Sequence, residues 1–571
     1  MNKITLLNIL NNQLSNNKSS AFSISDYYAA KTTDNISHIY FTIPRNKGKV
    51  DFDIYDYEML FNDEKTKNII RNGKTIGCFY IESPGMRSLL RKLNCDTFEM
   101  LTAASSIIRP GVAESGMMQE FVARHKNPGR RKYLFSAMEK HLGETYGVMI
   151  YQEDVIKIAH HIAGLSLVEA DLLRRAMSGK LRSRTAMKRI SDHFFFSCKK
   201  NGLDNNIAHE LWRQIKSFAG YAFCKAHSAS FALLSFQVAY LKAHYPAEFM
   251  ASVLSNSGGY YSAAVYINEI KRLNIKILLP CVNHSKSEYT VVENGKSIRI
   301  GFMAIKKLTK YAVDKIITER KRNGQYISLS DFIIRTKLNY EEMKILIRCG
   351  SMETFGQTRP TLMRLLDIYI SHRRLLDESY NDLFAYESFN LEKSVVTMRE
   401  YSDEEKCSAE YEIFGYMITK HPLDFFARII NTDKIVHASE MINFNGRKIK
   451  MVGWYMAAKR IKTKNGNIMK FLSLEDLTGT FEAVLFPETY SRYAEKTMSM
   501  GPYLLEGKVD TDGGNNLIVE KLTVLSDINT AAFTQKDSAE NKYFGDVEKI
   551  TEDEVTLVSS LGKERLRVAY L

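Results

Sequence analysis

Four side chains in two short segments have the chemical types that bind phosphate groups. Arg174 and Arg175 are neighbours in the sequence, and Lys225 and His227 follow Gly220 in a second segment. Guanidinium groups match phosphate oxygens in pairs, a lysine adds a point charge, and a histidine adds a hydrogen bond. The sequence therefore offers a phosphate-binding cluster if the fold brings the two segments together. Taken alone, an arginine pair is more often part of a solvated basic surface, and this alternative stays open.

The segment around the two arginines has the pattern of a capped amphipathic helix. Ser166 and Glu169 have the spacing of a capping box, and Gly179 can end the helix. Apolar residues at helical spacing predict a buried stripe, which consists of Val168, Leu172, Leu173 and Ala176. Such a stripe would turn both guanidinium groups away from the core. Lys225 and His227 are expected in a loop that leads into an apolar helix.

A second candidate site consists of acidic residues that can hold metal ions. Asp51 and Asp53 are separated by one residue, and Asp56 follows. Alternate residues of a strand point to the same side, and phosphoryl transfer with two metal ions needs carboxylates that hold the ions about 4 Å apart. The alternative, which we favour, is a connecting segment without metal. His160 and His161 predict one surface and one core position on a helix rather than a metal site.

Composition and charge narrow the class of protein. The chain has 571 residues, enough for roughly three to five domains. Lysine and arginine exceed aspartate and glutamate by 79 − 65 = 14, which favours a polyanionic partner such as nucleic acid. The seven cysteines form no Cys-x-x-Cys pair, which argues against a disulfide framework or zinc ribbon. The longest apolar run, near Ala229 to Leu241, is too short to span a bilayer, so we expect a cytoplasmic protein without a membrane partner.

The segment from 448 to 526 changes to a β pattern. Five short strands with glycine-containing turns suit a small closed barrel, most simply an OB-fold, and Asn465-Gly466 predicts the first hairpin. The basic run before this turn is the candidate surface for single-stranded nucleic acid, and it consists of Lys459, Arg460, Lys462 and Lys464. The aromatic residues that can stack on bases are Trp454, Tyr455, Phe471, Phe481 and Phe486. Strand alternation buries some of these rings, and a solvated hairpin remains the alternative.

Several blocks, in order along the chain, resemble the bacterial DNA polymerase III alpha subunit, a C-family DNA polymerase, and those at 146–153, 170–177 and 223–237 resemble its fingers. The blocks span residues 77–87, 108–117, 146–153, 170–177, 223–237, 280–285 and 300–306. The resemblance implies that Arg174, Arg175, Lys225 and His227 hold the triphosphate of an incoming dNTP. It also implies binding of template–primer DNA and single strands.

The resemblance also bears on catalysis. The whole enzyme would need Mg²⁺, and the palm carboxylates of the family precede the block at 77–87, so we expect those ligands outside this chain. We therefore assign no catalytic residue and no metal ligand, and we expect the chain alone to be inactive. Other polymerase subunits, or a separate palm-bearing chain, are expected partners.

Departures from the family pattern cluster next to the predicted nucleotide site. Tyr80 stands where the family commonly has glutamine, Cys224 replaces asparagine, and Ala226 replaces serine. These changes resemble an error-prone branch of the family more than the main replicative one.

Two further regions resemble interaction modules of the family. Residues 328–375 resemble its tandem helix-hairpin-helix region, where a helix ends at Gly350 and backbone N–H groups can meet a DNA phosphate; a plain helical bundle is the alternative. The sliding-clamp peptide of the family would lie at 380–384, with Leu383 and Phe384 as its apolar residues and Tyr380 in place of the usual glutamine.

We therefore predict a multidomain α+β protein with mainly helical fingers, a helix-hairpin-helix region and then a small β-barrel (OB-fold). The predicted boundaries are 1–60 for a poorly ordered lead-in and connector, 61–255 for fingers, 256–325 for a mixed α/β extension, 326–375 for the helix-hairpin-helix region, 376–445 for a linker and helical excursion, 446–530 for the OB-fold and 531–571 for a C-terminal tail. The predicted function is the C-terminal part of a polymerase that extends DNA 3′ ends. The alternative is a non-catalytic DNA- and clamp-binding module, or the remnant of a truncated polymerase gene.

Overall fold

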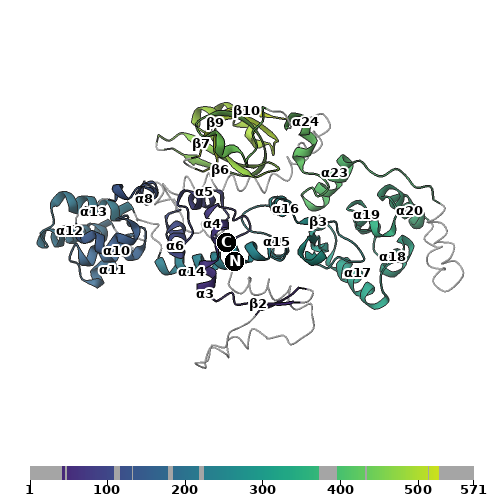
Figure 1. Ribbon diagram of the computed structural model, residues 1–571, viewed down its shortest axis with the longest axis horizontal. Helices are drawn as coiled ribbons and strands as arrows, with labels where there is room; N and C mark the ends of the chain where they lie inside the picture. Colours follow the sequence, from purple (N-terminus) through teal and green to yellow (C-terminus); the bar gives the residue numbers. More distant parts are fainter. Residues whose placement is uncertain are drawn as a thin grey trace, which may run out of the picture. The chain divides into compact units, whose positions relative to one another are not determined.

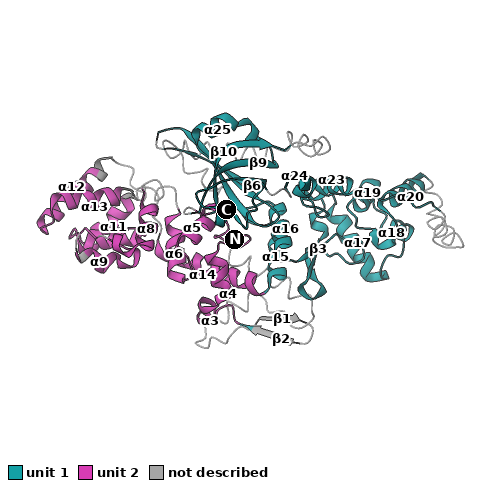
Figure 2. Cartoon of the chain, turned by 45° about the horizontal axis from the view of Figure 1, so that its top comes forward, with its two compact units in different colours: residues 1–52, 245–511, 515–571 teal, residues 53–244, 512–514 magenta. Residues whose placement is uncertain are grey.

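The computed structural model describes most of the chain between residues 41 and 525. The described residues are 41–45, 48–108, 116–131, 133–134, 136–177, 184–217, 224–371, 395–430, 434–463, 465–511 and 514–525 (Figure 1). Lys464, Leu383 and Phe384 lie outside them, as do residues 1–40 of the predicted lead-in and the predicted tail 531–571. The chain divides into two compact units, coloured in Figure 2. Unit 2 comprises residues 53–244 and 512–514, and unit 1 comprises the rest.

Unit 2 is helical throughout its described residues, as the sequence pattern predicts. Its helices are α3 (Tyr57–Asn62), α4 (Glu64–Arg71), α5 (Pro84–Lys92), α6 (Phe98–Ile107), α8 (Met117–Lys126), η2 (Pro128–Arg130), α9 (Ser136–Leu142), η3 (Gly143–Thr145), α10 (Gln152–His161), α11 (Leu167–Met177), α12 (Arg184–Lys200), α13 (Asn205–Ser217) and α14 (Lys225–His244). Polar caps begin several of them: the Asp63 carboxylate accepts the Thr66 N–H at 2.8 Å, and the Thr97 hydroxyl accepts the Met100 N–H at 3.2 Å.

Helix α14 packs against α3, α4 and α6 of unit 2. Its second half, from Ser235 to Lys242, is buried on all sides, which fits a helix that is apolar around most of its circumference. Its buried polar groups all find partners. Gln237 donates to the Ile54 carbonyl at 3.0 Å, and Lys242 donates to the carbonyls of Lys74 at 2.9 Å and Ile76 at 2.8 Å. These bonds fasten α14 to the segments at the start of the unit.

Helix α11 begins as predicted but buries a different face. The capping box is present, because the Ser166 N–H donates to Glu169 at 2.8 Å and the Glu169 N–H donates back to the Ser166 hydroxyl at 3.3 Å. The predicted stripe is wrong for Val168 and Leu172, which are 72% and 44% exposed. The buried positions are instead Ala170, Leu173 and Ala176, at i, i+3 and i+6. The small side chains of Ala170 and Ala176 allow α11 to pack closely against α10. The size of a side chain was therefore a poor guide to its burial on this helix.

The described part of unit 1 starts with a hairpin and continues as a mixed α/β region. Strand β1 (Phe41–Arg45) pairs with β2 (Gly48–Phe52) in antiparallel register. Helices α15 (Pro246–Ser255) and α16 (Ala263–Arg272) precede a three-stranded sheet of order β3-β5-β4, whose strands are Lys276–Leu278 (β3), Thr290–Val292 (β4) and Ser297–Arg299 (β5). The sequence predicts β3 and β5, and it misses β4, which is three residues long.

Helices then follow up to residue 430. They are η5 (Phe302–Ala304), α17 (Lys310–Asn323), α18 (Leu329–Thr336), α19 (Tyr340–Arg348), η6 (Glu353–Phe355), α20 (Arg359–Ser371), α23 (Asp403–Phe414), η7 (Pro422–Phe426) and α24 (Ala427–Ile430), while η4 (Glu293–Gly295) lies between β4 and β5. The acidic run 403–405 lies in the first turn of α23, where carboxylates suit the positive end of a helix. Among the described residues, no helix of either unit is both long and apolar enough to cross a bilayer.

The last five strands close into a barrel of order β10-β8-β7-β6-β9. They are β6 (Lys448–Lys462), β7 (Ile468–Glu475), β8 (Thr480–Leu485), β9 (Tyr503–Asp510) and β10 (Asn516–Val524), with η8 (Met441–Phe444) before them and α25 (Pro487–Tyr493) and η9 (Glu495–Met498) between β8 and β9. Strands β8 and β10 run parallel, and the other neighbours run antiparallel. This is the predicted OB-fold, with the helix between the third and fourth strands as an addition that the sequence did not indicate.

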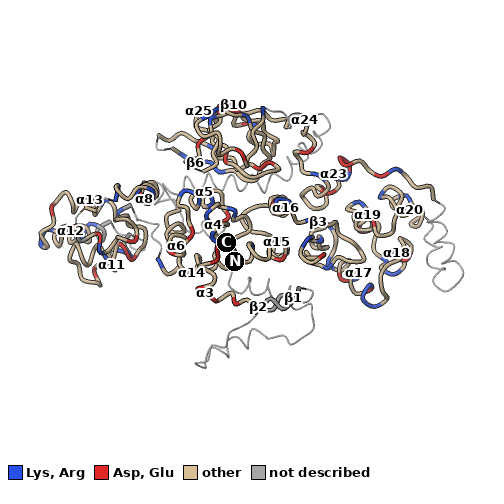
Figure 3. Tube along the Cα trace, viewed as in Figure 1, with Lys and Arg blue, Asp and Glu red and all other residues tan. Residues whose placement is uncertain are grey.

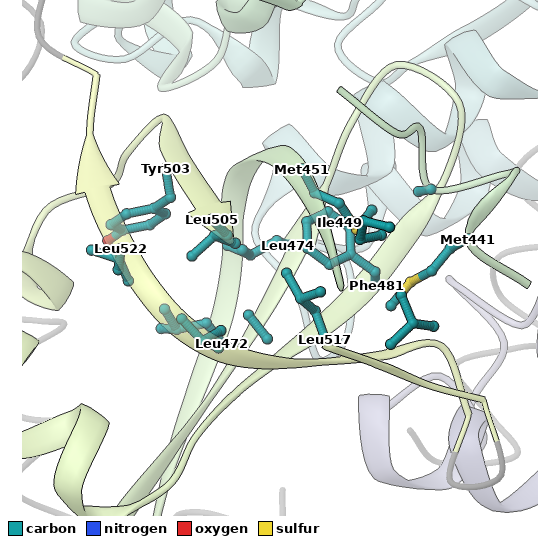
Figure 4. Packing of buried hydrophobic residues seen from close by; sticks show 14 of the residues in the cluster. Met441, Ile449, Met451, Leu472, Leu474, Phe481, Tyr503, Leu505, Leu517 and Leu522 are labelled. Carbon is teal, nitrogen blue, oxygen red and sulfur yellow. The ribbon is translucent and has the colours of Figure 1, made fainter. Parts of the chain in front are cut away.

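The barrel core is apolar and consists of alternate strand residues. Figure 4 shows these side chains meeting inside the barrel, among them Met451, Leu472, Leu474, Phe481 and Leu505. Gly453 is needed on β6, because a Cβ there would lie 2.8 Å from the Leu474 side chain. Phe481 is therefore a core residue, which removes it from the rings that can stack on bases.

Candidate functional site

The two predicted arginines share one carboxylate. Asp171, one turn earlier on α11, accepts from Arg174 through Nε at 2.8 Å and Nη2 at 2.7 Å, both on Oδ1. Its other oxygen, Oδ2, accepts from Arg175 Nε at 2.6 Å. Hydrogen bonds from Arg174, with the charge of Arg175, lower the pKa of Asp171, so the carboxylate stays ionised at neutral pH. The arginines are thus held side by side in fixed orientations before any ligand binds.

Lys225 is held in the same way by a different acid. Its Nζ lies 2.6 Å from Oε1 and 2.7 Å from Oε2 of Glu144, and it lies 5.4 Å from the centre of the Tyr151 ring. Lys225 is the first residue of α14, and its backbone N–H donates to the Glu153 carboxylate at 2.9 Å. The expected placement of Lys225 and His227 on a loop is therefore wrong, because α14 already begins at Lys225 and includes both residues.

The start of α10 connects the arginine pair to the Lys225 segment. Gln152 accepts from Arg174 Nη1 at 2.9 Å, and the next residue, Glu153, accepts the Lys225 N–H. Two neighbouring residues thus fix two cationic segments that lie about fifty positions apart in the sequence. The structure connects Arg174, Arg175 and Lys225 in a cluster that we call the α10–α11–α14 cluster, comprising residues 144, 151–153, 171, 174, 175 and 225.

Burial and charge around the start of α10 make this junction rigid. Asp154 accepts the N–H groups of Ile150 and Tyr151, each at 3.0 Å, and is almost fully buried. Burial raises the pKa of Asp154 to about 6, although these hydrogen bonds oppose the rise. Tyr151 is 2% exposed, and burial raises its pKa far above the usual range, so it stays neutral. The cluster therefore rests on buried, hydrogen-bonded residues at the start of α10.

His227 lies on the same helix but belongs to a different set of contacts. Its ring lies 4.2 Å from the Phe231 ring, and Phe231 lies 4.7 Å from the Tyr80 ring, measured between centroids. His227 is exposed, whereas Phe231 and Tyr80 are half-buried. His227 therefore presents its ring to solvent close to the cluster, as the first member of an aromatic series.

Two of the three acidic residues that were considered for a metal site, Asp53 and Asp56, accept backbone N–H groups. Strand β2 ends at Phe52, so Asp53 lies beyond the strand and accepts the Tyr55 N–H at 2.8 Å, while Asp56 caps α3 by accepting the Met59 N–H at 3.0 Å. In the described part of the chain, no three His, Cys, Asp or Glu residues are grouped so that they hold a metal ion. His160 donates through Nδ1 to the Leu165 carbonyl at 2.7 Å, and His161 is exposed and stacks on His141.

The basic run of the barrel lies on strand β6, and strand geometry splits it. Lys459 pairs in register with Phe471, whereas Arg460 pairs with Lys470. Lys470 is buried and donates to the Thr497 carbonyl at 3.1 Å, so Arg460 and Lys470 are on the core side, and Lys459 and Phe471 are on the outer side. Lys462 is exposed near the hairpin. Trp454 instead packs against a cluster that includes Leu423 and Phe426, so it supports the 421–430 segment.

Two turns of the helix-hairpin-helix region differ in whether their backbone N–H groups are available to a ligand. At the predicted Gly350 turn, the N–H groups of Gly350 and Ser351 donate inward, to the carbonyls of Ile347 at 3.0 Å and Leu346 at 2.9 Å. These amides are engaged, so the expected phosphate contact there is wrong. The turn itself forms because Gly350 adopts φ +78°, and a Cβ would meet the buried Arg359.

The exposed turn between α17 and α18 has the opposite arrangement. Arg335 donates to the carbonyls of Gly324 at 2.8 Å and Gln325 at 3.2 Å. Because C=O and the following N–H are antiparallel in a trans peptide, the Gln325 N–H points away from Arg335. Three cations, Arg320, Lys321 and Arg322, form the last turn of α17, and Figure 3 shows blue gathered at that end of the helix.

Sequence reasoning missed the acids and amide that hold the cluster. Asp171 stands three and four residues before the arginines, the spacing at which acidic and basic side chains meet on a helix, so it was readable in principle. Gln152, Glu153 and Glu144 had no such signal, because only the fold brings them to Arg174 and Lys225.

Comparisons with known proteins agree with these features. Family models match residues 32–202 as a bacterial DNA polymerase III alpha subunit finger domain, residues 274–362 as a helix-hairpin-helix motif, and residues 449–525 as an OB-fold nucleic acid binding domain. Proteins named DNA polymerase III subunit alpha from Campylobacter jejuni and Bacillus subtilis are 36% and 34% identical over 439 and 453 residues, which is 74% and 78% of this chain. One from Staphylococcus epidermidis is 32% identical over 480 residues, or 83% of this chain. The chain spans 36%, 39% and 44% of the lengths of these three relatives, respectively.

Proposed function

Because this chain belongs to the bacterial DNA polymerase III alpha subunit family, we propose that it binds an incoming deoxynucleoside triphosphate and template–primer DNA for extension of a 3′ end. The observation that carries the proposal is the link through Gln152 and Glu153 between Arg174 and Lys225. A triphosphate carries several negative oxygens, and it suits a site in which guanidinium and ammonium groups are held on one rigid base.

The geometry supports the triphosphate because Arg174 keeps N–H donors to spare and because Arg175 and Lys225 are exposed. Arg174 uses its Nε, one N–H of Nη2 and one N–H of Nη1 on Asp171 and Gln152, and a guanidinium has five N–H donors. Arg175 is 57% exposed and Lys225 is 39% exposed, so both can reach a ligand. Asp171 acts as a positioning residue, while Glu144 must share or release Lys225 when phosphate binds.

DNA binding is proposed for two surfaces of unit 1. The α17–α18 turn combines an outward amide at Gln325 with the cations Lys321 and Arg322, which suits a backbone phosphate of duplex DNA; Arg320 is instead bonded to the carbonyls of Val282 and Ser285. The outer side of the barrel places Lys459 in register with Phe471, which suits a single strand, because the ring can stack on a base and the ammonium can follow the backbone.

Catalysis by the whole enzyme would use Mg²⁺, and we propose that another polypeptide segment holds it. The described residues do not fit a magnesium site, because Asp53 and Asp56 are engaged with backbone N–H groups. No step of the reaction is therefore placed on this chain's acids. Contact with a sliding clamp through Leu383 and Phe384, and with other polymerase subunits, is also proposed from the family resemblance. A non-catalytic DNA- and clamp-binding module is the alternative.

Nucleotide binding is the direct test of the proposal. Calorimetric titration of the full chain with inorganic tripolyphosphate should show binding that Lys225→Ala weakens by roughly tenfold. A matched control is Arg213→Ala, which removes an exposed arginine paired with Glu210 on α13. Equal weakening by both variants, or no binding to the wild-type chain, would contradict the triphosphate site.

Primer extension separates the proposal from the alternative. With Mg²⁺, primed template and four dNTPs, the chain alone should extend no primer, and addition of a palm-bearing partner should restore extension. Restored extension that Lys225→Ala then reduces would support the polymerase role. Unchanged inactivity with the partner, together with intact DNA binding, would favour the non-catalytic module. Extension by the chain alone would show that its own acids do serve the metals.

A further inference from the structure

The turn at residues 280–285 of unit 1 brings two arginines together with a histidine. Arg320, in the last turn of α17, donates to the carbonyls of Val282 at 2.6 Å and Ser285 at 2.8 Å. Arg299, the last residue of β5, donates to the carbonyl of Leu279, directly before the turn, at 3.2 Å. His284 belongs to the turn itself and is exposed. We call residues 284, 299 and 320 the β5–α17 site.

The β5–α17 site holds positive charge without a carboxylate to balance it. Elsewhere in unit 1, partly buried arginines are paired with acids: Arg272 lies 2.8 Å from one glutamate, and Arg335 lies 3.3 Å from another. Within the described ranges, no aspartate or glutamate forms an ion pair with Arg299, Arg320 or His284. Two guanidinium groups that only backbone carbonyls hold leave a net positive charge, which a bound anion would balance.

Electrostatic effects on the histidine show that both arginines act on the same place. Partial loss of solvent around the ring, followed by the charges of Arg299 and Arg320, lowers the pKa of His284. The ring is therefore neutral at pH 7 when nothing is bound. An anion among the three side chains would oppose these charges and favour the protonated ring, so the site can gain a further positive charge as it binds.

Both arginines keep N–H donors that their backbone contacts do not use. Arg320 spends one N–H of each Nη on a carbonyl, and Arg299 spends one N–H of Nη1. The Nε of Arg299 is buried and has no hydrogen-bond partner among the described residues. A guanidinium has five N–H donors, and a buried donor without an acceptor costs free energy. The site therefore favours a ligand that brings several acceptor oxygens.

Charge distinguishes two kinds of phosphate ligand for this site. A phosphate monoester carries about −1.5 to −2 charge at neutral pH and has three acceptor oxygens. A phosphate diester, as in the backbone of DNA, carries a single charge. Two guanidinium groups match the charge of a monoester, and each can donate to its oxygens in a fork. The third oxygen remains for the ring of His284.

We propose that Arg299, Arg320 and His284 bind a phosphate monoester, either at the end of a DNA strand or as free inorganic phosphate. The proposal goes beyond the proposed function, because it depends neither on the triphosphate site of unit 2 nor on a backbone phosphate at the α17–α18 turn. It also gives a role to the block at 280–285, which none of the proposed nucleotide and DNA contacts uses.

The first test uses small phosphates and the full chain. All proteins carry Lys225→Ala, which weakens the proposed triphosphate site, and calorimetric titrations at pH 7.5 are run at constant ionic strength. Inorganic phosphate should bind roughly tenfold more tightly than dimethyl phosphate, a diester. Arg299→Gln and His284→Ala should each weaken binding of inorganic phosphate by roughly five- to tenfold. His284 is exposed, so its alanine variant tests the site even where Arg299→Gln disturbs the fold.

The second test asks whether the phosphate belongs to a DNA end. Fluorescence anisotropy compares a short labelled duplex that has a 5′-phosphate with the same duplex that has a 5′-hydroxyl. A DNA end as the ligand predicts a preference of roughly tenfold for the phosphorylated duplex, which both variants reduce to within about twofold. Arg348→Gln is the control in both tests, because it removes the same charge from an arginine that is paired with Glu412 at 2.6 Å. Thermal midpoints of all variants are measured alongside.

The outcomes identify the source of the phosphate or reject the site. Loss of phosphate binding in both variants, together with a preference for the 5′-phosphate, supports the proposal with a DNA end as ligand. The same loss without that preference supports it with free phosphate as ligand. Phosphate binding that stays unchanged in both variants, or that falls equally in Arg348→Gln, would overturn the proposal, as would the absence of phosphate binding. None of these results bears on the triphosphate site, which tripolyphosphate and Lys225→Ala test separately.

Discussion

The fingers cluster and the barrel strand hold their cations in opposite ways. In unit 2, Arg174 and Arg175 share Asp171, and Lys225 is bonded to both oxygens of Glu144. On the outer side of β6, no carboxylate of the described residues forms an ion pair with Lys459 or Lys462. A cation that is oriented by an acid suits a ligand of fixed shape, whereas an unpaired exposed lysine suits a polyanion of variable path.

Unit 1 also contains a charge that is held by partners on another element, but this charge is buried. Glu475, at the end of β7, is 1% exposed and accepts from Arg272 at 2.8 Å and Asn268 at 2.6 Å, both on α16. Burial raises the pKa of this carboxyl, and Arg272 opposes the rise. The barrel therefore uses the buried charge of Glu475 to attach α16 and leaves Lys459 and Lys462 exposed to solvent. In unit 2 the charges that partners hold in place belong to Arg174, Arg175 and Lys225, which are themselves the candidate phosphate-binding groups.

Arg272→Ala should have the largest effect, because it leaves Glu475 buried without its cation. Breaking a buried pair by removing one partner costs about 3–5 kcal/mol of the free energy of unfolding. Urea unfolding is followed by the fluorescence of Trp454 in a Trp212→Phe background. The loss should shrink at acidic pH, where protonation of Glu475 removes the buried charge.

A matched control is Arg492→Ala, which breaks an exposed i, i+4 pair with Glu488 on α25 of the same barrel. It should change the free energy of unfolding by less than about 0.5 kcal/mol. If Arg272→Ala lowered the free energy of unfolding by less than about 1 kcal/mol, the Arg272–Glu475 pair would not be what attaches α16 to the barrel.

Arg174→Ala tests the cluster at its most connected residue. The variant removes bonds to both Asp171 and Gln152 and one guanidinium from the ligand, so tripolyphosphate affinity should fall by about 10- to 100-fold. Titration calorimetry measures the affinity. Arg213→Ala is the control, because Arg213 makes a similar bidentate pair with Glu210, at 2.7 and 2.6 Å, outside the cluster. A fall of less than threefold would place the triphosphate elsewhere.

The sequence predicted what depends on local pattern. The five barrel strands, the Asn465-Gly466 turn and the capping box at Ser166 follow from periodicity and turn chemistry, and the structure confirms them. The family and the fold class followed from the order of the blocks, and the comparisons confirm both. The boundaries of the domains and the roles of the site residues remain predictions.

The failures occurred where a distant contact decides the outcome. Val168 and Leu172 look like core residues on a helical wheel, but α10 packs against the alanine face of α11. The sequence at Gly350 predicted a turn that contacts a phosphate, but the N–H groups of Gly350 and Ser351 donate to carbonyls of the preceding helix. Gln152 and Glu153 gave no signal, because their partners lie on two other helices.

A third prediction concerns the pH dependence of unit 1. Burial, with the charges of Lys271 and Arg272, lowers the pKa of His421 to about 3, so the ring stays neutral in the folded protein. Below pH 6.5 the unfolded chain binds a proton there that the folded chain refuses. The free energy of unfolding should therefore fall as the pH drops below 6.5, by at most about 1.4 kcal/mol per pH unit.

His421→Asn should flatten this part of the profile. An asparagine oxygen can still accept the Leu423 N–H, which His421 Nδ1 accepts at 3.1 Å, and it does not titrate. Urea unfolding at pH 7.5, 6.0 and 5.0, followed by Trp454, measures the effect. His161→Asn, at an exposed position of unit 2, is the control and should leave the Trp454 profile as it is. Identical slopes for His421→Asn and the wild type would remove His421 as the cause.

The smallest effect is expected for the barrel lysines, and it is best measured as a salt dependence. Lys459→Ala and Lys462→Ala each remove a cation that is proposed to neutralise one phosphate of a single strand. The slope of log K against log salt should become shallower by about 0.7 per lysine, with only a severalfold loss of affinity. Fluorescence anisotropy of a labelled dT oligonucleotide between low and moderate salt measures both quantities.

The control lysines lie on the same barrel and the same strand. Lys448 and Lys450 are bonded to Glu520 and Glu506, each at 2.8 Å, so their charges are already balanced. Alanine at these positions should leave the salt slope nearly unchanged, because few counterions are released from a lysine that is paired with a carboxylate. If all four lysines gave the same change in slope, the net charge of the barrel alone would govern binding. The contrast between oriented cations in the fingers and unpaired cations on the barrel would then carry no functional meaning for DNA.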